Sequence, residues 1–174
     1  MHVAEPEPSE PDADGVQPAL PVAPRWLDAD EKAAWTGFVA LMLLLPGRLE
    51  APLQQAHGLA LFEYLVLSAL SEAPERRLRM SELAGLANGS RSRLSNVVKR
   101  LEQRGLLWRA PDPADGRYTA AGLTDSGCDL VARAAPVHLE SVRRLVLDPL
   151  TGSDQAALTS IAGKLRLGPE ELSG

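Results

Sequence analysis

The segment between Ser90 and Arg104 places hydrogen-bonding and cationic side chains at helical spacing. With about 100 degrees of rotation per residue, its apolar residues fall on one side of a helix and its polar residues on the other. The apolar side consists of Leu94, Val97, Val98 and Leu101. The polar side and its flanks carry Ser92, Arg93, Ser95, Asn96, Lys99, Arg100 and Gln103. Arginine pairs with guanine and asparagine with adenine, so this face suits the edges of base pairs.

The order of the polar residues along this helix predicts two kinds of contact. Residues in the first turns, where a helix reaches deepest into a major groove, are expected to read bases. These are Ser92, Arg93, Ser95 and Asn96. Lys99 and Arg100 lie further along the helix and suit backbone phosphates. The N–H groups of Ser90 and Arg91 are expected at the helix start, where they would bind an anion.

The region around this helix is basic, although the protein as a whole is acidic. Residues 76–117 hold ten Lys and Arg against four Asp and Glu, a net charge of +6. The whole chain has a net charge of −5. Residues 1–24 account for all of it, because they hold five acids and no Lys or Arg. The rest of the chain is therefore neutral overall but polarised. A basic surface on patterned sequence is expected to meet nucleic acid.

A short helix and a tight turn are predicted just before the polar helix. Ser81 is the expected N-cap of a helix that runs to Ala87, and Asn88-Gly89 has the composition of a turn. Ser90 would then cap the polar helix. Two helices joined in this way are typical of a helix-turn-helix, whose second helix enters the major groove.

A hairpin is predicted after Gly105, the expected end of the polar helix. Residues 106–110 and 117–123 are expected to form strands around a turn rich in Pro, Asp and Gly. This arrangement indicates a wing. Arg117 follows the turn and is expected to enter the minor groove beside the helix.

Two helices are predicted before this module. The first begins at the capping pair Asp28 and Glu31, is kinked or broken near Pro46, and ends at Gly58. The second covers about residues 60–73, because apolar residues recur there at helical spacing.

Two more helices are predicted after the wing. One runs from residue 124 or 125 to about residue 147 and is bent or interrupted at Pro136. The last is capped by Thr151 with Asp154 and ends near residue 167. The fold class is therefore mainly α, with a small β-hairpin wing.

The remaining composition limits the classes of function. Residues 1–24 are rich in Pro and acids and are expected to be disordered, and they lack the features of a secretory signal, which favours the cytoplasm. The apolar run Leu41–Leu45 is far too short to span a membrane, so no membrane segment is expected. No CxxC or HExxH motif is present, so we expect no metal and no cofactor. No nucleophile with a base and no motif with paired carboxylates is present, so we expect no enzyme.

Cys128 is the single cysteine of the chain. No cation lies beside it in the sequence to lower the pKa of its thiol. We therefore expect a small, partly buried apolar side chain rather than a redox sensor.

Several segments, in this order, resemble the MarR family of bacterial transcriptional regulators. They are Arg79–Ala84, Ser90–Ser95, Lys99–Leu106, Asp115-Gly116-Arg117 and Leu123–Gly127. The resemblance covers residues 26–167 and implies a homodimer that binds palindromic promoter DNA. It also implies dimerisation through the terminal helices. The expected domains are a tail (1–24), a dimerisation helix (25–58), a winged helix-turn-helix (59–123) and C-terminal dimerisation helices (124–174).

The resemblance also implies release of DNA by a small, frequently aromatic acid. A pocket would lie where the first, second and fifth helices meet the winged module. His57, Phe62, Tyr64 and Arg79 are the candidate residues there. The alternative is a helical dimeric ligand-binding or interaction module that has lost DNA binding. The polar face of the 90–104 helix argues against this alternative.

Overall fold

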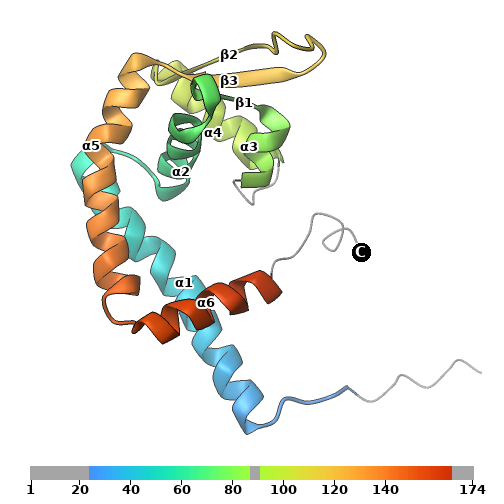
Figure 1. Ribbon diagram of the computed structural model, residues 1–174, viewed down its shortest axis with the longest axis vertical. Coiled ribbons are helices and arrows are strands. Elements are labelled where there is room, and N and C mark those ends of the chain that lie inside the picture. The colour runs from blue at the N-terminus through green and yellow to red at the C-terminus, as the bar shows by residue number, and fades with distance from the viewer. Residues whose placement is uncertain (1–23, 87–90, 166–174) are drawn as a thin grey trace, which may run out of the picture. The chain divides into compact units, whose positions relative to one another are not determined.

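The structure is a computed structural model that describes residues 24–86 and 91–165, without the side chains of Leu86 and Arg91. The chain divides into two compact units, Met1–Thr36 and Gly37–Gly174. The second unit contains the sheet and every described helix after the first (Figure 1).

Helix α1 covers Ala29–His57. Its predicted capping pair is confirmed, because Glu31 N donates to Asp28 Oδ1 at 2.8 Å and Asp28 N donates to Glu31 Oε2 at 3.1 Å. Gly58 follows the helix with a φ of 61°, a left-handed conformation that ends helices. The predicted break near Pro46 is wrong, since the helix continues through it. A proline removes one helical hydrogen bond, and the exposed ring of Pro46 faces solvent, so the rest of the helix is kept.

Helix α2 covers Leu61–Glu72, as predicted. A short 3₁₀ turn, η1 (Pro74–Arg76), leads from it into the sheet. Glu75 and Arg76 have φ values of 52° and 54°, which are uncommon for residues with a side chain. The sequence did not predict this turn.

Helix α3 covers Met80–Leu86. The prediction of Ser81 as its N-cap is wrong, since the helix begins one residue earlier. Arg79 N donates to Glu82 Oε2 at 2.8 Å, so a carboxylate three residues on satisfies the free N–H before the first turn.

Helix α4 covers Arg91–Gln103. The predicted turn Asn88-Gly89 and the predicted cap Ser90 lie outside the described residues. The predicted end is confirmed, because Gly105 has a φ of 69°.

The sheet is antiparallel, with strand order β1-β3-β2. The predicted hairpin is β2 (Leu107–Pro111) with β3 (Thr119–Leu123), and a third strand, β1 (Arg77–Arg79), was not predicted. A strand of three residues is too short to show an alternating pattern. Trp108 lies opposite Gly122, where a Cβ would approach the indole ring to 2.1 Å. Only glycine fits beneath this ring.

The chain after the wing forms α5 (Asp125–Val142), a π-helical turn η2 (Arg143–Leu147) and α6 (Gly152–Lys164). The interruption predicted at Pro136 is wrong, because α5 continues through it and the irregular turn comes later. As at Pro46, the proline costs one hydrogen bond without ending the helix. The predicted cap of α6 is confirmed, with Asp154 N donating to Thr151 Oγ1 at 3.2 Å.

The hydrophobic core contains residues of α1, α2, α3, α4, α5 and the sheet. Its largest fully buried side chains are Leu53, Leu59, Leu67, Leu70, Leu83, Leu94, Leu101, Leu107, Val66 and Val98. These leucines and valines place α4 on a packed base, with its polar residues facing outward.

Helix α1 has a mean hydropathy of 1.3 over an 18-residue window and is long enough to cross a membrane by length and composition alone. The sequence prediction considered only the short apolar run Leu41–Leu45. Length and composition alone do not test the expectation of no membrane segment, which stays a prediction. A helix with an exposed apolar face meets the same criteria when it packs against another protein chain.

Candidate nucleic-acid interface

Helix α4 has the two faces that the sequence predicts. Leu94, Val97, Val98 and Leu101 are at most 4 % exposed and belong to the core. The opposite face is solvent-exposed and carries Ser92, Arg93, Ser95, Asn96, Lys99 and Arg100. The backbone of Arg91 begins the helix, while Ser90 lies outside the described residues. The buried face therefore orients the polar face.

A buried carboxylate links α4 to α2. Glu63 is 7 % exposed, and its Oε1 accepts a hydrogen bond from Arg100 Nε at 3.2 Å. Its Oε2 accepts from Ala60 N at 3.2 Å and lies 3.5 Å from Arg104 Nη1. Because the Arg100 side chain is still 57 % exposed, one part of its guanidinium pairs with Glu63 while the rest faces solvent. The sequence did not reveal Glu63, since its partners lie on another helix.

Arg93 also contacts α2. Its guanidinium lies over the ring of Phe62, 4.6 Å from the centroid, in a cation–π contact. Phe62 was predicted as a ligand residue, and in the structure it supports a predicted base-reading residue.

The wing carries Arg117 beside Asp115. Arg117 Nη2 donates to Asp115 Oδ2 at 2.6 Å, and Arg117 Nε donates to Asp115 Oδ1 at 3.0 Å. This pairing lowers the pKa of Asp115 below its ordinary value. The Arg117 side chain remains 85 % exposed. Tyr118 N donates to Asp115 O at 3.0 Å, so residues 117 and 118 belong to the turn rather than to the predicted strand.

Arg79 anchors the wing. Its Nε donates to Asp112 Oδ2 at 2.7 Å, and its guanidinium lies 4.9 Å from the ring centroid of Tyr118. Asp112 Oδ1 also accepts from Ala114 N at 2.7 Å and from Asp115 N at 3.1 Å. The hydrogen bond from Arg79, together with those from the backbone, lowers the pKa of Asp112 to about 2. Asp112 was missed in the sequence, because only folding brings it to Arg79.

Most cations of the basic segment have an acidic partner on the protein itself. The pairs are Arg76 with Asp125, Arg77 with Glu75, Arg79 with Asp112, Arg100 and Arg104 with Glu63, Arg109 with Glu102, and Arg117 with Asp115. The +6 count therefore overstates the charge that the folded surface presents. A DNA phosphate that binds one of these arginines would therefore contact a guanidinium that also pairs with a carboxylate of the protein.

The four predicted ligand residues have different surroundings in the described structure. Phe62 and Arg79 line separate clefts. Tyr64 is 5 % exposed, and its ring packs against His138 with centroids 4.5 Å apart. His57 Nε2 and His138 Nδ1 are buried without a hydrogen-bond partner in the described chain. Burial lowers the pKa of His138 and raises that of Tyr64.

Cys128 is partly buried against the core, as predicted. The sequence places no cation beside it, but the fold brings Arg76 Nη1 to 3.0 Å from its sulfur. No cluster of three or more metal-ligating side chains occurs within residues 24–86 and 91–165.

Helix α4 on a three-stranded antiparallel sheet, with an exposed loop between β2 and β3, defines a winged-helix protein. A sequence profile of the MarR family matches residues 57–117. The transcriptional regulator HosA of Escherichia coli O111:H- is 30% identical over 103 residues, which cover 59% of this chain and 74% of HosA.

Two solved structures from Streptomyces coelicolor resemble the chain. The MarR family regulator Sco3205, crystallised in complex with DNA, is 42% identical with a TM-score of 0.78, over 82% of this chain and 89% of Sco3205. AbsC, also of this family, is 37% identical with a TM-score of 0.76, over 80% of this chain and 93% of AbsC. The chain belongs to the MarR family. It is a DNA-binding transcriptional regulator and not an enzyme.

Proposed function

We propose that this regulator is a cytoplasmic, homodimeric repressor that reads a pseudo-palindromic promoter site with α4 and the wing. The observation that carries this proposal is the outer face of α4. Six polar or cationic side chains are exposed there, directly opposite four core residues. A face held by the core and lined with donors and acceptors suits a major groove.

The positions along α4 support separate roles. Ser92, Arg93, Ser95 and Asn96 are proposed to read bases. Lys99 and Arg100 are proposed to contact phosphates, and the backbone N–H groups of Ser90 and Arg91 an adjacent phosphate. Arg117, exposed on the wing, is proposed to enter the minor groove.

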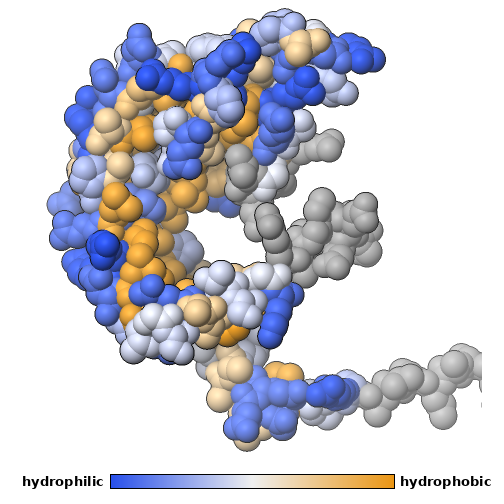
Figure 2. Space-filling view, in the orientation of Figure 1, coloured by the Kyte–Doolittle hydropathy of each residue, from blue (hydrophilic) through white to orange (hydrophobic). Residues whose placement is uncertain are grey.

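The apolar surface supports a dimer. From Gly37 onward, large apolar side chains at least 36 % exposed gather on α1, α5, η2 and α6, and apolar surface is visible in the region of α5 (Figure 2). They include Phe38, Leu41, Met42, Leu43, Leu44, Leu139, Leu147, Leu158, Ile161 and Leu165. Apolar surface of this extent indicates an interface. A second copy of the chain is the proposed occupant, and a membrane is not.

Dimer symmetry sets the form of the operator. A two-fold dimer presents two α4 helices, so half-sites about 10 base pairs apart are expected. Bound across a promoter, such a dimer would block transcription.

The DNA proposal is tested by a gel shift on the DNA upstream of the protein's own gene, followed by footprinting. A shift at low salt, with two protected half-sites, is expected. A single unpaired half-site would contradict the dimeric operator, and no shift at low salt would contradict this choice of target.

The dimer proposal is tested by Leu41→Glu in sedimentation experiments. A charge in an apolar interface is costly to bury, so the variant should be a monomer with unchanged helical circular dichroism. Gln54→Glu adds the same charge at an exposed polar position of α1 and should remain a dimer. A dimeric Leu41→Glu would place the interface elsewhere.

We also propose a small aromatic or acidic effector near His57 and Tyr64. The support is the buried Nε2 of His57 and Nδ1 of His138, since an unpaired buried polar group costs about 1–3 kcal/mol and a ligand could satisfy it. A panel of aromatic acids should raise the melting temperature and release DNA. His57→Phe should lose this response but keep DNA binding.

A further inference from the structure

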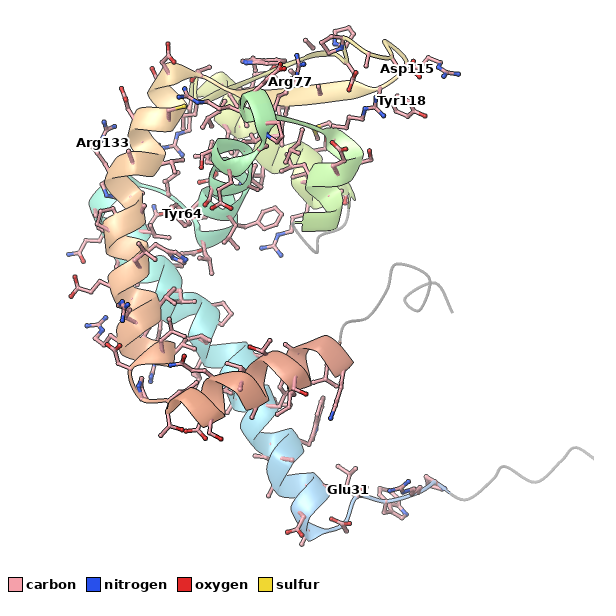
Figure 3. All side chains as sticks on the ribbon, in the orientation of Figure 1. Glu31, Tyr64, Arg77, Asp115, Tyr118 and Arg133 are labelled. Atoms are coloured by element: carbon pink, nitrogen blue, oxygen red, sulfur yellow. The ribbon has the colours of Figure 1, made fainter. Side chains whose placement is uncertain are left out.

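A cleft lies between α4 and the wing. It has a volume of about 320 Å³. Residues from α3, α4 and the β2–β3 hairpin line it: Met80, Ser81, Ser95, Arg109, Arg117, Tyr118 and Thr119. In Figure 3 the Tyr118 side chain lies on the side of the wing where α3 lies.

The lining of this cleft suits an anion. It carries four hydroxyl groups and two guanidinium groups, and none of its lining residues is acidic. Three other clefts, which are also lined by described residues, each include a glutamate. The four hydroxyls, on Ser81, Ser95, Tyr118 and Thr119, make no hydrogen bond within the part of the chain that the structure describes, so they remain available to an external acceptor.

The two arginines of the cleft lining bind their carboxylates through the same edge of the guanidinium. Arg109 pairs with Glu102, and Arg117 with Asp115, in each case through Nε and Nη2. Within the described residues, no contact uses Nη1 of either guanidinium. Each carboxylate therefore orients its arginine and leaves the two N–H donors of Nη1 for another anion.

In a DNA complex, the anion nearest this cleft would be a backbone phosphate. One sugar–phosphate strand separates a major groove from the minor groove beside it. If α4 occupies the first groove and the wing the second, as in the proposed function on which this step rests, that strand must pass between them. The cleft lies at this place.

We propose that the cleft seats the phosphate strand between the two grooves. This proposal adds four phosphate-contacting residues to those on α4: Ser81, Arg109, Tyr118 and Thr119. Hydroxyl and guanidinium groups are common donors to DNA phosphates and carry no sequence information. The cleft therefore sets the register of α4 and wing on the duplex.

Tyr118→Phe tests this proposal, because it removes one hydroxyl and keeps the ring that lies against Arg79. The probe is a duplex selected by the wild-type protein from a random pool, with single phosphates replaced by neutral methylphosphonates. Tyr118→Phe should weaken binding to the unmodified duplex about threefold to tenfold, similarly on other sequences. At one particular phosphate, the methylphosphonate should cost Tyr118→Phe less binding affinity than it costs the wild type. The reason is that the substitution and the methylphosphonate remove the same contact.

Three comparisons complete the test. Ser126→Ala removes an exposed hydroxyl on α5, outside the cleft, and should bind as the wild type does. The salt slope is the change in the logarithm of the DNA-binding constant with the logarithm of the salt concentration. Arg109→Gln should lower the size of this slope by about one unit, whereas Tyr118→Phe should leave it unchanged. The cleft proposal would be overturned if Tyr118→Phe bound DNA with wild-type affinity. It would also be overturned if the substitution changed the effect of every methylphosphonate equally. If Arg93→Ala still altered base preference in that case, the proposed function would stand without the cleft.

Discussion

Helix α4 and the wing form the two parts of the proposed DNA surface, and different forces hold them. Four residues of α4 are buried in the core, at most 4 % exposed, so apolar packing holds its outer face. The wing loop is held by Asp112, which accepts hydrogen bonds from Arg79 and from two backbone N–H groups. The outer face of the helix therefore depends on apolar burial, and the wing loop depends in part on hydrogen bonds to the Asp112 carboxylate.

This difference has consequences for solution conditions. Apolar burial is insensitive to pH, whereas an ion pair weakens when its carboxylate is protonated or when salt screens it. We expect the wing to loosen under conditions that leave α4 in place. Variants and pH changes can test the two parts separately.

The largest expected effect is on the core side of α4. Leu101→Ala should lower the free energy of unfolding by about 2–5 kcal/mol, because Leu101 is fully buried and its loss leaves a cavity. Chemical denaturation followed by circular dichroism measures this change. Gln103→Ala, on the exposed side of the same helix, should stay within about 0.5 kcal/mol of the wild type. Similar values for both variants would mean that burial does not hold α4.

The next effect concerns Arg93. Arg93→Ala should cost about 1–3 kcal/mol of binding free energy on the preferred sequence and relax the preference at one base pair. Binding to a set of duplexes with single base changes measures both. An equal loss on specific and random DNA would remove Arg93 from the base-reading residues.

Lys99→Ala should have a smaller and uniform effect. Lys99 is exposed further along α4, so its loss should weaken all sequences alike and lower the salt slope by about one unit. Titrations at several salt concentrations measure the slope, with Gln103→Ala as the uncharged control. A sequence-dependent loss would instead assign Lys99 to base reading.

The smallest effect is on the wing and appears in acid. The folded pKa of Asp112, about 2, lies below its ordinary value of 3.8, so its stabilising effect is complete above pH 3.8 and is lost as the pH falls toward 2. Hydrogen exchange should show the amides of Ala114 and Asp115 losing protection over this pH range. In Asp112→Asn, part of this protection should already be lost at higher pH. Asp154→Asn, which removes another carboxyl of lowered pKa on α6, should leave these amides unchanged. Full protection in Asp112→Asn would show that something else holds the wing.

Local residue patterns predicted much of the fold. The period of Leu94, Val97, Val98 and Leu101 located the buried face of α4, since a helix places residues three and four apart on one side. Capping pairs predicted the starts of α1 and α6, because these bonds span only three residues. The same local reasoning predicted a kink or break at Pro46 and a bend or interruption at Pro136, and both helices continue through their prolines without a break.

The sequence by itself determined the family, the order of the helices and the β2–β3 hairpin, and the polar face of α4, because these depend on residues close together in the chain. Only the tertiary structure decided which distant acids Arg79 and Arg100 meet. Glu63 reaches Arg100 and Asp112 reaches Arg79 across long separations, and Arg76 reaches Cys128 in the same way. Strand β1 likewise exists only because β3 supplies its hydrogen bonds. Such contacts depend on how the helices and strands pack, which no local pattern records.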